Sequence, residues 1–178
     1  MDNGKLSVRY ARALLNTATQ QGCDTEVYDC LMRLTNNYGL AIGKFDEILK
    51  NPIIGQDEKI QLLETAIGEP VHDLLKQFLR FVAEQKRENK IYTIALKYQE
   101  MYREEKDILR TEVTMATELP EATMRMIKGF VEQTFDCTAE LHTKVDPSLI
   151  GGFILDIENN RMDASVAGQL NALKQKLK

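Results

Sequence analysis

The sequence predicts a mainly α protein in which an N-terminal six-helix bundle, residues 1–106, is followed by a small α+β domain, residues 107–178. Two observations support this prediction. Before the boundary, apolar residues recur with the 3.6-residue period of amphipathic helices. After Asp107 they alternate with a period of two, which is typical of half-buried strands. No stretch rich in proline, glycine or serine separates the two parts, so we expect a short joint.

Glycine, proline and capping residues divide the first part into helices joined by short links, as in a helical bundle. Gly22 ends the first helix, and we expect Asp24 to cap the second and Gly39 to end it in the left-handed conformation. We expect Pro70 to open the fifth helix, because a first-turn proline loses no hydrogen bond. The expected helices cover residues 7–22, 25–38, 42–50, 57–67, 71–89 and 91–107.

The second part is predicted to mix strands and helices. Its first strand alternates so that Leu109, Thr111, Val113 and Met115 share one face. A polar turn is expected at Asn159-Asn160, with a short return through Met162. The expected elements are strands over residues 109–116, 138–146 and 151–159, a helix over residues 121–135 and a final helix over residues 165–178.

Composition and charge exclude several classes of protein. The formal net charge is −4, which argues against nucleic-acid binding, since that needs a basic field. No stretch approaches the roughly 20 apolar residues of a membrane span, so any membrane contact is expected to be indirect, through partners. Cys23, Cys30 and Cys137 are too few and too scattered for a disulfide framework, and we expect reduced thiols of a cytoplasmic protein.

Motifs that carry chemistry are absent from the sequence. It has no Gly-rich phosphate-binding loop of the GxxxxGK[ST] type. Gly151-Gly152 precedes a strand rather than a helix, so a turn or close packing is favoured over anion binding. His142 follows Cys137 at a spacing that could bind metal, but zinc needs three or four ligands. The sequence therefore predicts no catalytic residue, no cofactor-binding residue and no metal site.

Two helices carry more apolar surface than one packing face requires, since a surface helix needs a stripe only about 100° wide. The first helix has an apolar side and a second one roughly opposite, formed by Leu6, Tyr10, Ala13 and Leu14 with Thr17 among them. The core stripe of the fifth helix is widened by Leu74, Leu79 and Phe81. Either these helices lie at the centre of the bundle, buried all round, or they form a groove that receives a partner helix.

Four segments of the sequence resemble the ATP synthase δ subunit family, which includes the mitochondrial oligomycin-sensitivity-conferring protein. They are RYARALLNTA, NPIIGQDEKIQLLE, FLRFVAEQKRENK and VDPSLIGGFILDIENNRMDASVAGQLNALKQKL. The last is the most specific, because it joins a hydrophobic strand, paired glycines, a polar hairpin and a final helix in one run. The resemblance covers essentially the whole chain, in order.

The resemblance implies a non-catalytic stator subunit of a proton- or sodium-translocating ATP synthase. It implies that the helical domain binds the N-terminal helices of the α subunits on the catalytic head, and that the C-terminal domain binds the b subunit of the peripheral stalk. The family's glycine pair corresponds to Gly151-Gly152, and its hairpin acid to Asp163. Carried over position by position, the partner-binding residues are Tyr10, Ala13, Leu14, Thr17, Phe78, Phe81 and Val82.

The start of the sequence, MDNGKLSVRY, has neither a signal core nor a transit segment. This favours a bacterial protein, held peripherally at the cytoplasmic face of the inner membrane by its complex. Two other hypotheses are a free-standing helical adaptor protein and a hydrolase. A hydrolase would need a deep pocket with converging polar groups, whereas an adaptor would not recover the α, β and b subunits from solubilised membranes.

Overall fold

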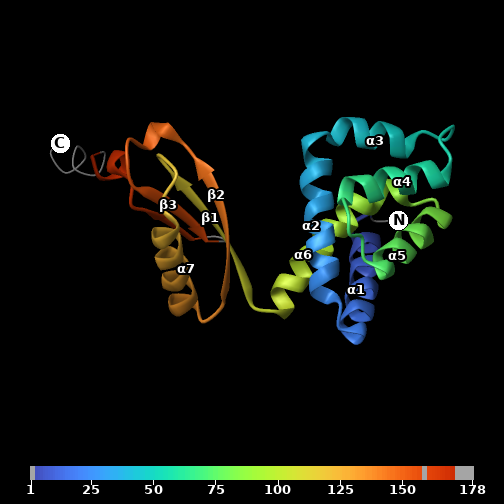
Figure 1. Cartoon of the computed structure of the whole chain (residues 1–178), viewed down its shortest axis with the longest axis horizontal. Helices are drawn as coiled ribbons and strands as arrows, with labels where there is room; N and C mark the ends of the chain where they lie inside the picture. Colours follow the sequence, from blue (N-terminus) through green and yellow to red (C-terminus); the bar gives the residue numbers. More distant parts are fainter. Residues whose placement is uncertain (1–2, 158–159, 171–178) are drawn as a thin grey trace. The chain divides into compact units, whose positions relative to one another are not determined.

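The computed structural model describes residues 3–157 and 160–170 of the 178-residue chain. The chain forms two compact units, Met1–Glu104 and Glu105–Lys178, of which the first is helical and the second contains the sheet (Figure 1). The sequence predicts this division slightly later, after residue 106. The predicted class, mainly α with a small α+β part towards the C-terminus, is confirmed.

The first unit consists of helices with short connections. The sixth helix ends shortly before the first strand, and Asp107 takes a positive φ of 51° in the turn between them. The helices are α1 (Asn3–Gln21), α2 (Asp24–Leu40), α3 (Ile42–Lys50), α4 (Gln56–Ile67), α5 (Asp73–Glu84) and α6 (Ile91–Glu105), with a short 3₁₀ helix, η1 (Glu88–Lys90), before α6.

Three residues expected to cap or open a helix do not have that role. Asp24 lies inside α2, whose N-cap is Cys23. Gly39 does not end α2, because the helix continues to Leu40 and leaves through Ala41 with a negative φ of −139°. Pro70 does not open α5, which begins at Asp73 after His72. The Nδ1 atom of His72 accepts a hydrogen bond from the Leu74 N–H at 3.2 Å, so a histidine side chain caps this helix.

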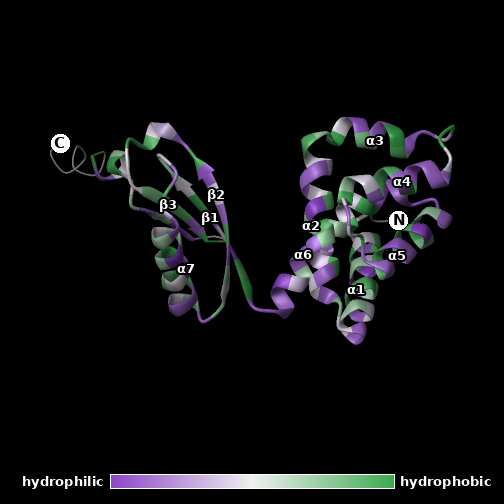
Figure 2. Ribbon diagram, in the orientation of Figure 1, coloured by the Kyte–Doolittle hydropathy of each residue, from purple (hydrophilic) through white to green (hydrophobic). Residues whose placement is uncertain are grey.

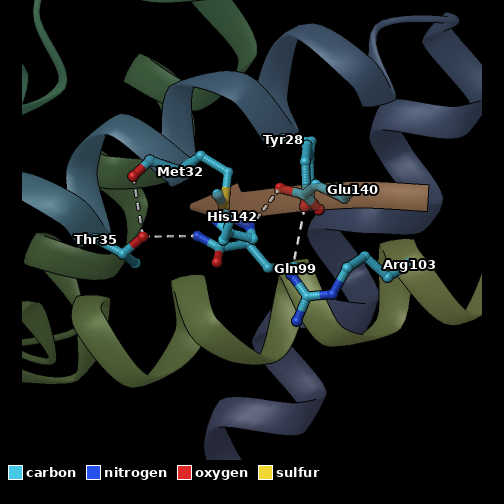
Figure 3. A network of polar contacts seen from close by, with 7 residues as sticks. All are labelled: Tyr28, Met32, Thr35, Gln99, Arg103, Glu140 and His142. Carbon is cyan, nitrogen blue, oxygen red and sulfur yellow. Dashed lines mark hydrogen bonds and ion pairs between the residues drawn. The ribbon is translucent and has the colours of Figure 1, made fainter. Parts of the chain in front are cut away.

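The core of the helical unit receives buried apolar side chains from each of its helices, among them Ala11, Leu34, Leu49, Leu63, Leu75 and Ile94. A polar network crosses this core between α2 and α6. The Nε2 atom of Gln99 donates to Thr35 Oγ1 at 2.9 Å, and Arg103 Nη1 donates to the Tyr28 hydroxyl at 3.3 Å (Figure 3). Both partners of the first bond are buried, so this bond satisfies polar groups that water does not reach.

The second unit contains a four-stranded sheet with the order β2-β1-β3-β4. Strand β1 pairs in parallel with β2 and antiparallel with β3, and β3 pairs antiparallel with β4. The parallel pair requires a crossover, which helix α7 supplies. The elements are β1 (Ile108–Met115), α7 (Glu121–Phe135), β2 (Thr138–Val145), η2 (Pro147–Leu149), β3 (Phe153–Ile157) and β4 (Asn160–Asp163).

Helix α7 packs one apolar side on one face of the sheet. The resulting core comprises Val113, Met115, Ile127, Val131, Ala139, Leu155 and Ile157. The alternation predicted for β1 agrees, because Thr111, Val113 and Met115 are buried. In Figure 2 hydrophobic and hydrophilic segments alternate along α7 and along the helices of the first unit, which is the pattern of helices with one covered side.

The glycine pair before β3 allows a close approach of two chain segments. Gly152 has a φ of +75°, and a Cβ atom there would lie 2.3 Å from the Ala164 carbonyl oxygen. A Cβ atom on Gly151 would lie 3.2 Å from Cγ2 of Val166. The pair thus has the turn and packing role that the sequence predicts. Residues 166–170 are helical; residues 171–178 of the expected final helix and Asn159 of the expected turn lie outside the described residues.

Candidate partner-binding site

Helix α1 is apolar on two sides. Ala11 and Ala18 are fully buried within the helical unit. Leu14, expected on the second side, is also buried. Leu6, Tyr10 and Ala13 share another face, at spacings of four and three residues. These three side chains are half-buried or exposed. Helix α1 is therefore not buried all round, and its second apolar face is open.

Helix α5 also has a side that the core does not cover. Its buried side consists of Leu75, Leu79 and Val82. Next to it, Leu74 and Phe78 are only half-buried, and Phe81 is 49% exposed. A phenyl ring in water forgoes part of the stabilisation that its burial would give, so this side has apolar surface to offer to a partner.

The open sides of α1 and α5 enclose a groove with a volume of about 760 Å³, hereafter the α1–α5 groove. Grooves of this kind accept the apolar face of an amphipathic helix. Among the described residues, those that line the groove come from α1, α5 and the turn that follows α5. They are Lys5, Leu6, Arg9, Tyr10, Ala13, Leu14, Thr17, Leu74, Gln77, Phe78, Phe81 and Arg87.

An aromatic cluster joins the two helices inside the groove. The ring of Tyr10 meets that of Phe78 edge-on, with the centroids 6.4 Å apart. The Tyr10 and Phe81 rings are tilted to each other, with a centroid distance of 6.0 Å. Such pairs contribute more than the burial of their area alone, so the cluster helps to hold α1 and α5 at this separation.

Arg87 reaches the groove because α5 ends earlier than the sequence predicts, at Glu84 instead of Asn89. Lys86 turns left-handed with a φ of 55°. The Arg87 N–H donates to the Val82 carbonyl at 3.1 Å and the Lys86 N–H to the Ala83 carbonyl at 2.8 Å, which is a Schellman motif. The Arg87 guanidinium donates to the Tyr10 hydroxyl at 2.5 Å and lies 5.5 Å from that ring's centroid.

The structure brings all but one of the predicted partner-binding residues together. Val82 is the correction. It is fully buried and does not line the groove, because it lies on the same face of α5 as Leu75 and Leu79. The predicted residues that do line the groove are Tyr10, Ala13, Leu14, Thr17, Phe78 and Phe81.

Sequence reasoning missed the polar lining of the groove, namely Lys5, Arg9, Gln77 and Arg87. The sequence pattern of α1 could have indicated two of these residues. Lys5 and Arg9 precede Leu6 and Tyr10 by one residue each, so they flank the second apolar face of α1. Arg87 has no such local signal, since it lies beyond the end of α5.

Other polar clusters in the molecule make their own internal bonds. A smaller cavity of about 410 Å³ is lined by Arg33 and His72, among others. His72 Nδ1 caps α5, and Arg33 donates to the Pro70 carbonyl at 2.8 Å. In the second unit His142 Nε2 lies 3.2 Å from Glu140 Oε1. Within residues 3–157 and 160–170, no three His, Cys, Asp or Glu side chains are grouped so that they could hold a metal ion.

The hairpin acid Asp163 has a local structural role. Its Oδ1 atom accepts hydrogen bonds from the Ser165 hydroxyl at 2.6 Å and from the Ser165 N–H at 2.9 Å. These bonds hold the pKa of the Asp163 carboxyl below its usual value. Ser165 Oγ in turn accepts from the Gly168 N–H at 3.0 Å, which caps the start of the last helical segment.

Comparison with known proteins agrees with this architecture. Residues 6–177 match the family described as ATP synthase delta (OSCP) subunit. The chain is 35% identical to ATP synthase subunit delta of Phocaeicola vulgatus, over 97% of this chain and 93% of that protein. It is 36% identical to that of Parabacteroides distasonis, over 98% and 96%. A chain in the structure of the Toxoplasma gondii mitochondrial ATP synthase hexamer has the same fold, with a TM-score of 0.66, 22% identity and 97% coverage of both chains.

The chain thus belongs to the ATP synthase delta (OSCP) subunit family. It is a non-catalytic stator subunit of an ATP synthase, the complex that couples ion transport to ATP synthesis, and a peripheral component of that membrane-bound assembly. Among the described residues, no helix has the length and apolar character needed to cross a membrane.

Proposed function

We propose that the α1–α5 groove receives an N-terminal helix of the α subunits of the catalytic head, and that the second unit holds the b subunit of the peripheral stalk. The chain then links head to stalk at the cytoplasmic face of a bacterial inner membrane. Residues 1–106 act as one six-helix bundle, and residues 107–178 as the stalk-binding domain.

The observation that carries the head contact is the open apolar groove itself. Leu6, Tyr10 and Phe78 are half-buried there and Phe81 is 49% exposed, all on two helices that have already packed their other sides into a core. A second helix laid along this groove would bury these side chains, and each fully buried phenyl contributes roughly 1.5–3 kcal/mol.

The stalk contact rests on the family and on a less specific feature of the second unit. Met126 and Phe130 lie one helical turn apart on α7 and are 75% and 50% exposed. Apolar side chains exposed together in this way suit a protein contact. Two linked contacts on one chain raise the effective concentration of each, so the joint withstands brief loss of either one. A stator contact of this kind resists torque by burial alone and needs no chemistry.

The test is a calorimetric titration of a synthetic peptide with the N-terminal sequence of the organism's α subunit into wild-type protein and three variants. Phe81→Asp should weaken binding by more than tenfold, because it removes the ring contact and buries a carboxylate without a partner. Tyr10→Asp should act in the same direction. The matched control is Ile53→Asp, since Ile53 is 89% exposed on the same unit and lies outside the groove.

Circular dichroism separates loss of binding from loss of fold. Folded Phe81→Asp and Tyr10→Asp proteins that bind within twofold of wild type would place the head contact elsewhere. If Ile53→Asp weakened binding as strongly as Phe81→Asp, the contact would not be confined to the groove.

A further inference from the structure

The charged residues that line the α1–α5 groove, among those that the structure describes, are all cations. Its lining contains the cations Lys5, Arg9 and Arg87 and, among the described residues, no carboxylate. We call these three residues the cationic rim. None of them has an ion-pair partner within the part of the chain that the structure describes. The described residues therefore form no ion pair with the rim.

The cationic rim occupies one half of the groove. Lys5 and Arg9 lie one turn apart in the first part of α1, and Arg87 contacts Tyr10 in the same half. Ala13 and Thr17 line the other half, with no charged neighbour on α1 in the lining. The N-terminus of α1 adds its partial positive charge to the rim half, and the first turn of the described helix, from Asn3, carries no acidic residue.

Arg87 is held in place from both sides. The Schellman motif fixes the backbone before it. The next residue, Glu88, is buried and accepts a hydrogen bond from Lys59 of α4 at 2.7 Å. The Arg87 side chain donates a hydrogen bond to the neutral Tyr10 hydroxyl, and a guanidinium has five N–H donors. An arginine positioned in this way has donors left to bind a carboxylate.

We propose that the cationic rim binds an acidic side chain of the helix that occupies the groove, and that this contact sets the helix direction. The occupant carries an apolar stripe for Phe78 and Phe81 and an Asp or Glu that lies opposite Arg87. This inference rests on the proposed function, because its occupant is the N-terminal helix of an α subunit.

The experiment is a double-mutant cycle measured by titration calorimetry. The probes are the α-subunit peptide and versions in which each Asp or Glu is replaced singly by Asn or Gln. The proteins are wild type, Arg87→Gln, Arg87→Lys and Tyr10→Phe, with Arg80→Gln as the matched control. Arg80 is an exposed arginine of α5 that does not line the groove. Tyr10→Phe removes the hydrogen bond to Arg87 without removing charge.

We expect Arg87→Gln to weaken binding of the parent peptide roughly tenfold, since close charge pairs at interfaces couple strongly. One Asp or Glu replacement in the peptide should cause a similar loss of affinity for the wild-type protein. When Arg87→Gln is combined with that peptide, the fold-loss should be smaller than the product of the two single fold-losses. Arg87→Lys should restore part of the affinity, and Arg80→Gln should stay within twofold. Tyr10→Phe should weaken binding less than Arg87→Gln does, because it releases Arg87 from its hydroxyl partner but keeps the charge. Binding to wild type should weaken as salt rises, and less so for Arg87→Gln.

Independent effects of Arg87 and every peptide carboxylate would overturn the inference. So would a folded Arg87→Gln protein with wild-type affinity. In both cases a large effect of Phe81→Asp would leave the proposed function standing. A parent peptide that fails to bind wild-type protein at all would instead overturn the proposed function, and the cationic rim would lose its assigned occupant with it.

Discussion

Helix α1 in the first unit and helix α7 in the second each pack one apolar side into a core and leave other apolar side chains outside. On α1 the outer side chains face α5 across a groove of about 760 Å³. On α7 the outer residues Met126 and Phe130 lie on an exposed side, and a cavity of about 250 Å³ lies between this helix and β2. Apolar side chains outside the core thus line a groove in the first unit, whereas in the second unit they form an exposed side of a single helix.

The difference between α1 and α7 depends on which element lies next to the outer apolar face of each helix. Two helices with surplus apolar sides, α1 and α5, are needed to form a concave surface, and the aromatic contacts between Tyr10 and Phe81 connect them. Helix α7 packs on the sheet with one side and leaves Met126 and Phe130 exposed on another. A groove between two helices selects a partner helix that fits its width. An exposed apolar side of a single helix is less selective for the shape of its partner.

The largest effect that we expect comes from removing the second unit. A fragment of residues 1–105 should lose all binding to the b subunit and keep its affinity for the α-subunit peptide within twofold, because every residue of the groove lies in the first unit. Peptide titration and a pull-down of b measure the two outcomes. A fragment that still captured b would break the assignment of one partner to each unit.

Next in size is Lys59→Met. The Lys59–Glu88 pair has side chains only 6% and 11% exposed, so the substitution leaves Glu88 buried without its partner. Urea denaturation followed by circular dichroism should show a loss of roughly 3–5 kcal/mol in the helical unit. Lys76→Met is the control, because the Lys76–Asp73 pair is exposed and should change stability by less than about 1 kcal/mol. Equal losses of stability in Lys59→Met and Lys76→Met would contradict the claim that the buried Lys59–Glu88 pair anchors the turn that carries Arg87.

In the second unit, Gly152→Ala should destabilise by about 2–4 kcal/mol. Its Cβ atom would clash with the Ala164 carbonyl oxygen, and its φ of +75° disfavours any side chain. Gly129→Ala on α7 is the opposite control, since a Cβ there meets nothing within 4 Å, and alanine in a helix should gain roughly 0.5–1 kcal/mol. Thermal unfolding measures both. A neutral Gly152→Ala would show that the hairpin has more room than the structure gives it.

The smallest effect concerns pH. The hydrogen bonds from Ser165 lower the pKa of Asp163 in the folded state, while the unfolded chain has the ordinary value of about 3.9. Their contribution is therefore fully present above that value and is lost as pH falls through the lowered folded pKa. Asp163→Asn should reduce the acid sensitivity of the second unit, measured as the slope of stability between pH 5 and the acid transition, and an unchanged slope would assign the sensitivity to other carboxyls.

Much of the groove could be predicted from the sequence, because helical periodicity reports directly which side chains share a face. Tyr10, Ala13 and Thr17 are separated by three and four residues, and the structure keeps them on one side of α1. The family resemblance implies that Val82 binds the partner, whereas its spacing from Leu75 and Leu79 places it on the core side of α5.

The rest depended on contacts between residues far apart in the chain. The end of α5 is set by a left-handed lysine, Lys86, where a glycine would have given a signal. The turn after it is anchored by Lys59, 29 residues before Glu88. No local pattern indicates either feature, so Arg87 looked like part of a helix and its place in the groove could not be predicted.

The most direct test of the account is a map of backbone amide chemical-shift changes in the ¹⁵N-labelled full chain as the α-subunit peptide is added. We predict the largest changes along α1 around Tyr10, along α5 around Phe81 and at Arg87, with little change on α7. Changes concentrated on α7 or around Leu40 and Ile53, with α1 and α5 unaffected, would contradict the claim that the α1–α5 groove is where the catalytic head is held.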